Sequence, residues 1–297
     1  MYGVLDRPRL LLTLCALFWA GNFVLARAMH EALPPIGLAF WRWVGASLLV
    51  LPFVWRPMWR QREVIGRHFW RLSVLALLGV SGFNTLVYLG LQTTTATNSV
   101  LIQSTMPVQI LLLNGLLFAA PVRRRELVSI GLSLLGVLVI ITRGQPHLLA
   151  EADWKVGDLW VLGAALVWAL YSVLLRWRPA ELLPGAFLGF TLVVGSVALW
   201  PLYLFEQALG QSMPWNSAAI ATVIYVAVFP SALAYLFWNR GVALLGPAAA
   251  GHFIHLMPLF GSLMAVTFLG ERLGWYHGVG AVLVAVGIGL TWRRRLP

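Results

Sequence analysis

Ten long apolar stretches follow one another along the chain, and they constrain its fold more than any other feature. They lie at roughly 10–29, 35–55, 71–91, 95–118, 126–142, 157–176, 184–204, 217–239, 247–269 and 274–292. Most are close to the roughly 20 apolar residues that a helix needs to cross a bilayer. A helix pairs its backbone N–H and C=O groups internally, as the bilayer interior requires. The pattern therefore predicts an all-α integral membrane protein with ten transmembrane helices.

The composition supports a membrane protein over a soluble one. Of 297 residues, 60% are hydrophobic and 10% are charged, whereas soluble domains carry about 25% charged residues. The formal charge of +11 would suggest nucleic acid in a soluble protein. Here the basic residues lie between apolar runs, so we expect the lipid bilayer as partner and no nucleic acid. The single cysteine, Cys15, excludes a cysteine-cluster metal site, and we expect no cofactor.

The basic residues also predict the orientation. With the N-terminus inside, sixteen of the 21 Lys and Arg residues face the inner side, four face the outer side and Arg42 lies within a span. This bias follows the positive-inside rule and places both termini in the cytoplasm.

The two halves of the sequence resemble each other. A shift of 149 residues aligns ALFWAGNFVLAR (16–27) with ALVWALYSVLLR (165–176), and a shift of 151 aligns Pro107 with Pro258. We therefore predict two five-helix units, 1–146 and 147–297. Because five is odd, the second unit must enter the membrane from the opposite side. Such inverted repeats enclose a central cavity that opens to each side in turn, which favours a secondary transporter working by alternating access.

Several local features resemble the EamA-domain members of the drug/metabolite transporter superfamily. They are "FW" at 18–19, "VW" at 167–168, the mid-helix prolines Pro107 and Pro258, and "LGERL" at 269–273. The resemblance implies a central cavity and, in bacterial members, export of amino acids, related metabolites or drugs across the inner membrane. Glu271 is expected to stabilise the start of the last helix.

Polar side chains inside a bilayer should point toward protein or water, and their spacing places them on shared helix faces. The residues that we expect to bind a small amphipathic substrate are Trp19, Asn22, Asn84, Tyr88, Gln103, Met106, Trp168, Tyr171, Tyr235, Trp238, His252 and His255. The resemblance places four of them, Gln103, Met106, Trp168 and His255, at the family's cavity positions. Simple packing is the alternative for mid-span aromatic residues such as Trp168 and Tyr235.

Three features keep more than one interpretation. Pro107 and Pro258 free the carbonyls of Gln103 and Ile254, and the resulting kinks are either hinges or static bends. His252 and His255 either link helices by hydrogen bonds or contact substrate and carry a proton, and a metal site lacks an evident third ligand. Arg42 is expected to reach outward to the interface, the alternatives being a substrate carboxylate or a structural brace.

Other function classes fit less well. The only lysine, Lys155, lies in "DWKVG", so no phosphate-binding loop for ATP is present. "HFIHL" lacks the glutamate of an intramembrane metalloprotease, and the serine contexts match rhomboid-type chemistry poorly. We therefore expect no enzyme, and a lipid flippase on the same fold is the main alternative. The sequence is compatible with a homodimer.

Overall fold

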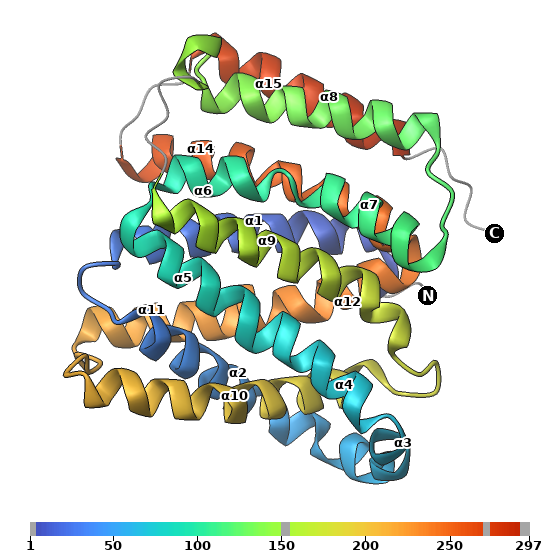
Figure 1. Ribbon diagram of the computed structural model, residues 1–297, viewed down its shortest axis with the longest axis vertical. Helices are drawn as coiled ribbons and strands as arrows, with labels where there is room; N and C mark the ends of the chain where they lie inside the picture. Colours follow the sequence, from blue (N-terminus) through green and yellow to red (C-terminus); the bar gives the residue numbers. More distant parts are fainter. Residues whose placement is uncertain (1–3, 150–154, 270–273, 292–297) are drawn as a thin grey trace.

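The computed structural model describes residues 4–149, 155–269 and 274–291, and every regular element in these ranges is helical (Figure 1). The α-helices are α1 (Pro8–Ala28), α2 (Pro35–Arg60), α3 (Arg62–Arg67), α4 (Phe69–Ala76), α5 (Phe83–Thr93), α6 (Ala96–Gln103), α7 (Met106–Phe118), α8 (Arg124–Ile141), α9 (Val156–Leu174), α10 (Pro184–Ala208), α11 (Ser217–Ala227), α12 (Ala234–Leu245), α13 (Pro247–Gly251), α14 (Met257–Leu269) and α15 (Trp275–Thr291). Glu271 lies outside the described residues.

Seven helical stretches are long and apolar enough to cross a membrane. They are Pro8–Ala28, Pro35–Arg60, Phe69–Thr93, Asn98–Phe118, Val156–Trp177, Pro184–Ala208 and Ser217–Leu245. Among the other helices, α8 opens with three charged residues and α15 has 17 residues. The chain is therefore a multi-pass α-helical protein in the parts that the structure describes.

Local sequence explains where many helices begin. Pro8, Pro35 and Pro184 occupy the first positions of α1, α2 and α10, where a missing N–H costs no helical hydrogen bond. Thr95 and Asn216 cap α6 and α11 by accepting hydrogen bonds from backbone N–H groups of the first turn.

Two membrane-crossing stretches contain a π-helical segment. The first, η2 (Leu77–Gly82), joins α4 to α5, and the second, η5 (Val228–Leu233), joins α11 to α12. Pro230 lies in η5 and has no N–H to donate to the preceding turn. Each segment leaves a carbonyl bonded to a side chain from elsewhere in the fold: Gly79 accepts from Tyr235, and Pro230 accepts from Trp19 and Arg42.

Two expected continuous helices are interrupted. The stretch expected at 95–118 is divided at Ser104–Thr105 into α6 and α7, and Pro107 lies in the first turn of α7. The stretch at 247–269 contains a 3-10 segment, η6 (His252–Leu256), between α13 and α14. The prolines therefore stand next to helix breaks, because proline cannot continue the hydrogen-bond ladder of the preceding turn.

Two pairs of helices pack in antiparallel fashion. At one edge of the bundle α8 lies against α15 (Figure 1), with Gly136 close to Gly280 and Ser129 donating to the carbonyl of Gly287 at 2.5 Å. A Cβ on Gly136 would lie 2.7 Å from the Gly280 oxygen, so this contact requires a glycine. Elsewhere α2 lies against α10, joined by the hydroxyls of Ser47 and Ser196 at 3.3 Å.

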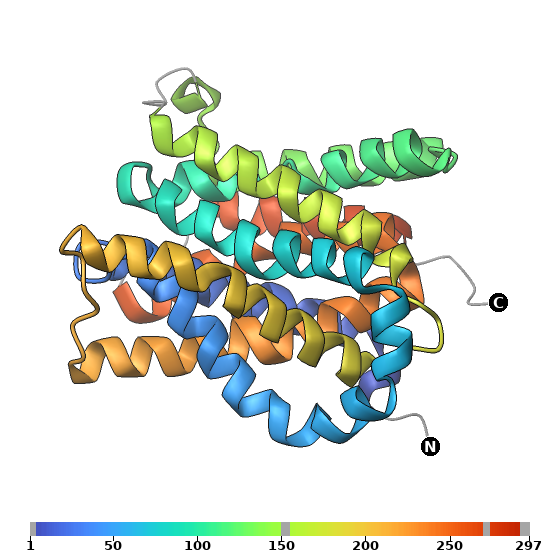
Figure 2. The ribbon, with the colours of Figure 1, turned by 60° about the horizontal axis from the view of Figure 1, so that its bottom comes forward.

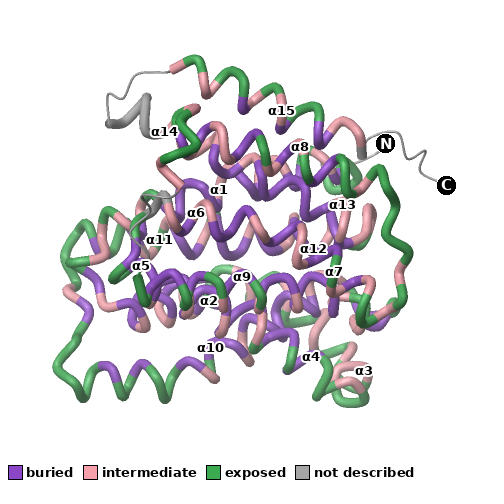
Figure 3. The backbone as a smooth tube through the Cα atoms, turned by 45° about the horizontal axis from the view of Figure 1, so that its top comes forward, coloured by how far each residue is buried: buried purple, intermediate pink, exposed green. Residues whose placement is uncertain are grey.

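In the core, α1 packs against α12, and Trp168 of α9 reaches Trp19 of α1 and Trp238 of α12. Alongside α9 lies α5 in both ribbon views (Figures 1 and 2). The tube in Figure 3 is largely buried along these central helices, whereas α3 has no buried residue. The buried centre therefore draws on helices from both halves of the sequence.

Candidate functional site

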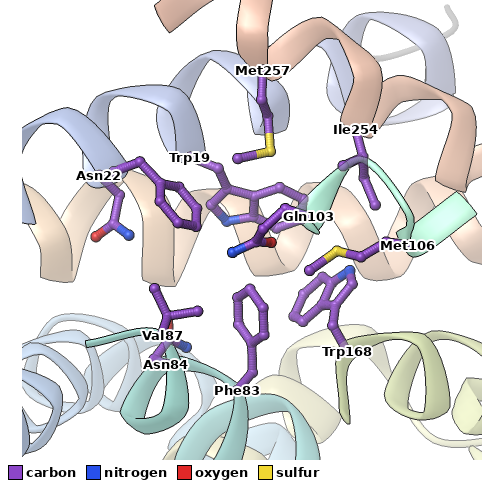
Figure 4. Close-up of a pocket in the computed structure, with 11 residues that line it drawn as sticks. Trp19, Asn22, Phe83, Asn84, Val87, Gln103, Met106, Trp168, Ile254 and Met257 are labelled. Atoms are coloured by element: carbon purple, nitrogen blue, oxygen red, sulfur yellow. The ribbon is translucent and has the colours of Figure 1, made fainter. Parts of the chain in front are cut away.

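A chamber lies in the centre of the bundle (Figure 4). It encloses about 330 Å³ between its lining atoms, but its interior admits roughly one water molecule. Its walls are Trp19, Asn22, Phe23, Phe83, Asn84, Val87, Gln103, Met106, Trp168, Ile254 and Met257. None of these residues is charged. The chamber is thus an aromatic and amide-lined space that is closed in this structure.

The chamber brings together half of the residues expected to bind substrate. Trp19, Asn22, Asn84, Gln103, Met106 and Trp168 line it. Tyr88, Tyr171, Tyr235, Trp238, His252 and His255 are fully or almost fully buried and do not line it. The chamber draws its expected residues from α1, α5, α6, α7 and α9, so both halves of the chain contribute.

Trp168 is the centre of an aromatic cluster. Its ring lies 5.0 Å from Trp19, 4.8 Å from Phe83 and 5.4 Å from Trp238, measured between centroids. Edge-to-face and tilted pairs at these distances add to the stability that burial gives. Because Trp19 and Trp168 are matched by the 149-residue shift, the equivalent aromatics of the two halves touch at the chamber.

Amide groups supply the polar surface of the chamber. The Gln103 side chain is 3% exposed, and its Nε2 has no hydrogen-bond partner in the described part of the chain. In Figure 4 the Gln103 amide reaches into the middle of the lining residues, and the nitrogen of Asn22 faces the same space. A buried donor without a partner is costly, so these amides favour a solute with hydrogen-bond acceptors.

Arg42 lies directly behind this wall and corrects our expectation that it reaches the interface. It is 1% exposed. Its Nε donates to Ser231 Oγ at 2.6 Å, and Nη2 donates to the Pro230 carbonyl at 3.0 Å. Its Nη1 donates to Asn22 Oδ1 at 3.1 Å and to the Tyr88 hydroxyl at 2.7 Å.

These bonds explain why the guanidinium stays inside. The π-helical segment η5 supplies the Pro230 carbonyl and the Ser231 hydroxyl as acceptors, and α1 and α5 supply the side chains of Asn22 and Tyr88. The cation is therefore solvated by protein instead of water. Tyr88 also donates to Asn22 Oδ1 at 2.9 Å. Both acceptor lone pairs of Asn22 are therefore used, and its N–H₂ group is left for the chamber.

Comparison with known proteins agrees with this architecture. The model of the EamA-like transporter family matches residues 8–142 and again 155–293. The chain belongs to the EamA-like transporter family. Its relatives include an uncharacterized transporter of Archaeoglobus fulgidus, 28% identical over 96% of this chain and 97% of that protein. Another is the uncharacterized transporter YyaM of Bacillus subtilis, 26% identical over 92% of this chain and 89% of that protein.

One solved structure resembles the fold as a whole. It superposes with a TM-score of 0.73 and covers 95% of both chains at 16% sequence identity, which establishes likeness of fold alone. The match to the family model confirms the resemblance to the EamA-domain members of the drug/metabolite transporter superfamily. As an EamA-like transporter, the chain is a multi-pass membrane protein of a family that transports small molecules.

In this EamA-like transporter the two histidines lie beside the chamber and not in its wall. His252 Nδ1 is 2.8 Å from the carbonyl of Ala248, and His255 Nε2 is 2.9 Å from the carbonyl of Ser104. Each ring therefore donates through one nitrogen, and the other nitrogen has no partner in the described residues. His255 bridges the break between α6 and α7. His255 thus links two distant segments, whereas His252 bonds within its own stretch, and proton transfer by either histidine stays a prediction.

Five lining residues were not anticipated from the sequence: Phe23, Phe83, Val87, Ile254 and Met257. Phe83 and Val87 are four residues apart on α5, and Asn84 is three residues before Val87. A search for apolar residues at these spacings from Asn84 and Val87 would have found both. Ile254 and Met257 line the chamber where His255 was expected. A 3-10 helix turns about 120° per residue instead of about 100°, so the five residues of η6 accumulate about 100° of extra rotation.

Proposed function

We propose that this protein is a secondary transporter that moves a small amphipathic metabolite by alternating access between two inverted halves. In the proposed topology ten helices cross the inner membrane of a bacterium, as units 1–146 and 147–297, with both termini in the cytoplasm. Export of an amino acid or a derivative is the direction and substrate class that we favour. The observation that carries the proposal is the chamber itself, closed and uncharged, at the meeting point of both halves.

Contacts between equivalent residues support inverted halves. Matched residues touch in three places: Trp19 with Trp168, Ser47 with Ser196, and Ser104 with His255. Equivalent elements can meet themselves only near a two-fold axis. The matched helices α8 and α15 run antiparallel, which an axis in the membrane plane produces. In Figure 1, α1 begins and α15 ends on the same side of the bundle, in agreement with termini on one face.

The closed chamber supports alternating access over a permanent pore. Its interior has room for about one water molecule, so a metabolite enters only after helices of the two halves separate. Aromatic faces would contact the apolar part of such a solute, and the N–H₂ groups of Asn22 and Gln103 would bind its oxygen atoms. The positive charge of Arg42 polarises Asn22 and strengthens it as a donor.

Flux in proteoliposomes tests the proposal. The purified protein is reconstituted, and the efflux of loaded amino acids is followed beside the scrambling of a labelled lipid. We expect solute efflux that Trp168→Ala reduces at least tenfold and that Trp70→Ala leaves unchanged, because Trp70 is 80% exposed and does not line the chamber. Lipid scrambling without solute flux would replace the proposal with a flippase.

The topology has its own test. A fluorescent protein fused to the C-terminus should be bright, and an enzyme reporter that is active only in the periplasm should be inactive there. A dark fluorescent fusion together with an active periplasmic reporter would reject the orientation, and with it the direction of transport.

A further inference from the structure

A second cavity opens at one end of the bundle, and we call it the vestibule. It lies between the end of α7, the start of α8, the 3-10 segment η4 (Leu175–Trp177) that follows α9, and the junction of α12 with α13. It holds about 620 Å³ including its open mouth. The side chains that give it its chemistry are Asn114, Arg123, Glu126 and Arg176. In Figure 1 the start of α8, the end of α7 and the end of α9 follow one another from top to bottom at the right of the bundle. The vestibule is charged where the chamber is neutral.

Arg176 is positioned at the vestibule without a carboxylate partner in the described part of the chain. Its guanidinium stacks on the ring of Phe118 at 4.9 Å from the centroid, which fixes the group while leaving its N–H donors available. Its match in the first half, Arg27, donates instead to the carbonyl of Leu91 at 3.0 Å. The same position is thus structural in one half and open to a ligand in the other.

Asn114 gives an independent indication of a ligand. Its side chain is 7% exposed, and its Oδ1 is a buried acceptor without a partner among the described residues. Native proteins seldom leave a buried acceptor unpaired. Because Asn114 lines the vestibule, a ligand with an N–H donor would satisfy it. The carboxylate of Glu126 also lines the vestibule, where its Oε2 accepts the backbone N–H of Arg123 at 3.1 Å.

Packed residues of α7 and α13 lie between the vestibule and the chamber, and we call this contact the seam. At Gly251 on α13, an added Cβ would lie 3.1 Å from Ile110 and 3.5 Å from the Pro107 Cα on α7. The chamber residues Met106 and Ile254 lie at the far end of this seam. A solute bound in the vestibule therefore stands next to the contact that must open before the chamber can be reached.

We propose that the vestibule is a loading site for a zwitterionic small molecule, separate from the chamber. Arg176 and Arg123 bind its carboxylate, and Asn114 with Glu126 binds its ammonium group. Two guanidinium groups suit a carboxylate by geometry as well as charge. The proposal rests on the transport function proposed above, and in that topology the vestibule faces the cytoplasm, where an exporter collects its substrate.

Equilibrium binding to the purified full-length protein in detergent tests this site. The probes are radiolabelled neutral amino acids. Two analogues of phenylalanine are compared with it: 3-phenylpropanoate, which lacks the amine, and phenylalaninamide, which lacks the carboxylate. We expect saturable binding of at least one zwitterion, weakened about tenfold by Arg176→Gln and only in part by Arg176→Lys. Arg124→Gln, on an exposed neighbour outside the vestibule, should leave the Kd unchanged.

The two proposals fail in different ways. Trp168→Ala should reduce flux while leaving vestibule binding intact, because the closed chamber has no room for the probe. If no zwitterion binds, or if Arg124→Gln weakens binding as much as Arg176→Gln, the loading site is refuted. Flux that still depends on Trp168 would leave the transport proposal standing. Equal binding of phenylalanine and phenylalaninamide would likewise overturn the assignment of Arg176 to a carboxylate.

Discussion

Replacing Arg42 by Met tests the central claim about the buried guanidinium. The substitution keeps an unbranched stem and removes four hydrogen bonds, to Ser231, Asn22, Tyr88 and the Pro230 carbonyl. If Arg42 braced only the surface, its loss would be nearly neutral, as at most exposed positions. Because it solvates a π-helical carbonyl and polar groups of two other helices, we expect a clear loss of stability.

The magnitude follows from what each partner keeps. The Pro230 carbonyl still accepts from Trp19, and Asn22 Oδ1 still accepts from Tyr88. Ser231 still donates to the Val226 carbonyl. No partner is left without any bond, so the sum of four charge-assisted bonds would overstate the cost. A hydrogen bond to a charged group contributes about 1.5–3 kcal/mol. Because every partner keeps another bond, we expect a loss of about 3 kcal/mol, the equivalent of one or two such bonds.

Unfolding in mixed micelles by titration with SDS measures this change in the free energy of unfolding. Arg60→Met is the matched control, since Arg60 lies on the same helix and is exposed. Arg42→Lys should fall between the two, because an ammonium keeps the charge but cannot reach all four acceptors. An Arg42→Met protein as stable as the Arg60→Met control would show that the network contributes nothing, and the reasoning would be wrong.

Three further predictions concern packing, capping and proton transfer. Gly136→Ala should destabilise the pairing of α8 with α15 by about 1–3 kcal/mol, whereas Gly131→Ala, where an added Cβ meets nothing within 4 Å, should be neutral in the same SDS titration. Glu206→Ala should cost about 1–2 kcal/mol in that assay, because the Glu206 carboxylate accepts the first backbone N–H groups of α2. His252→Ala and His255→Ala should abolish the pH dependence of flux in proteoliposomes without lowering expression.

Each of these has an outcome that counts against it. Equal effects of Gly136→Ala and Gly131→Ala would mean that the contact between Gly136 and Gly280 does not set the distance between α8 and α15. An unchanged free energy of unfolding in Glu206→Ala would mean that water can cap the start of α2 as well as the carboxylate does. Unchanged flux at every pH in both histidine variants would reduce His252 and His255 to the structural hydrogen bonds that they make.

The sequence by itself determined the character of this protein. Long apolar runs fix an α-helical membrane protein, because only internally paired backbone is stable in lipid. The FW and VW segments, the mid-helix prolines and LGERL together indicated the family. Half of the residues predicted to bind substrate line the chamber, including Trp19, Asn84 and Trp168. These inferences hold because an uninterrupted helix repeats its faces every 3.6 residues.

Tertiary structure decided what that periodicity could not. The break at Ser104–Thr105 and the 3-10 turn at 252–256 change the number of residues per turn, so Ile254 and Met257 face the chamber and His255 faces a carbonyl. Arg42 stays buried because η5, distant in sequence, offers it a free carbonyl. A sequence pattern specifies the faces of one helix, but the partners that satisfy a buried charge come from other helices, and only folding brings them together.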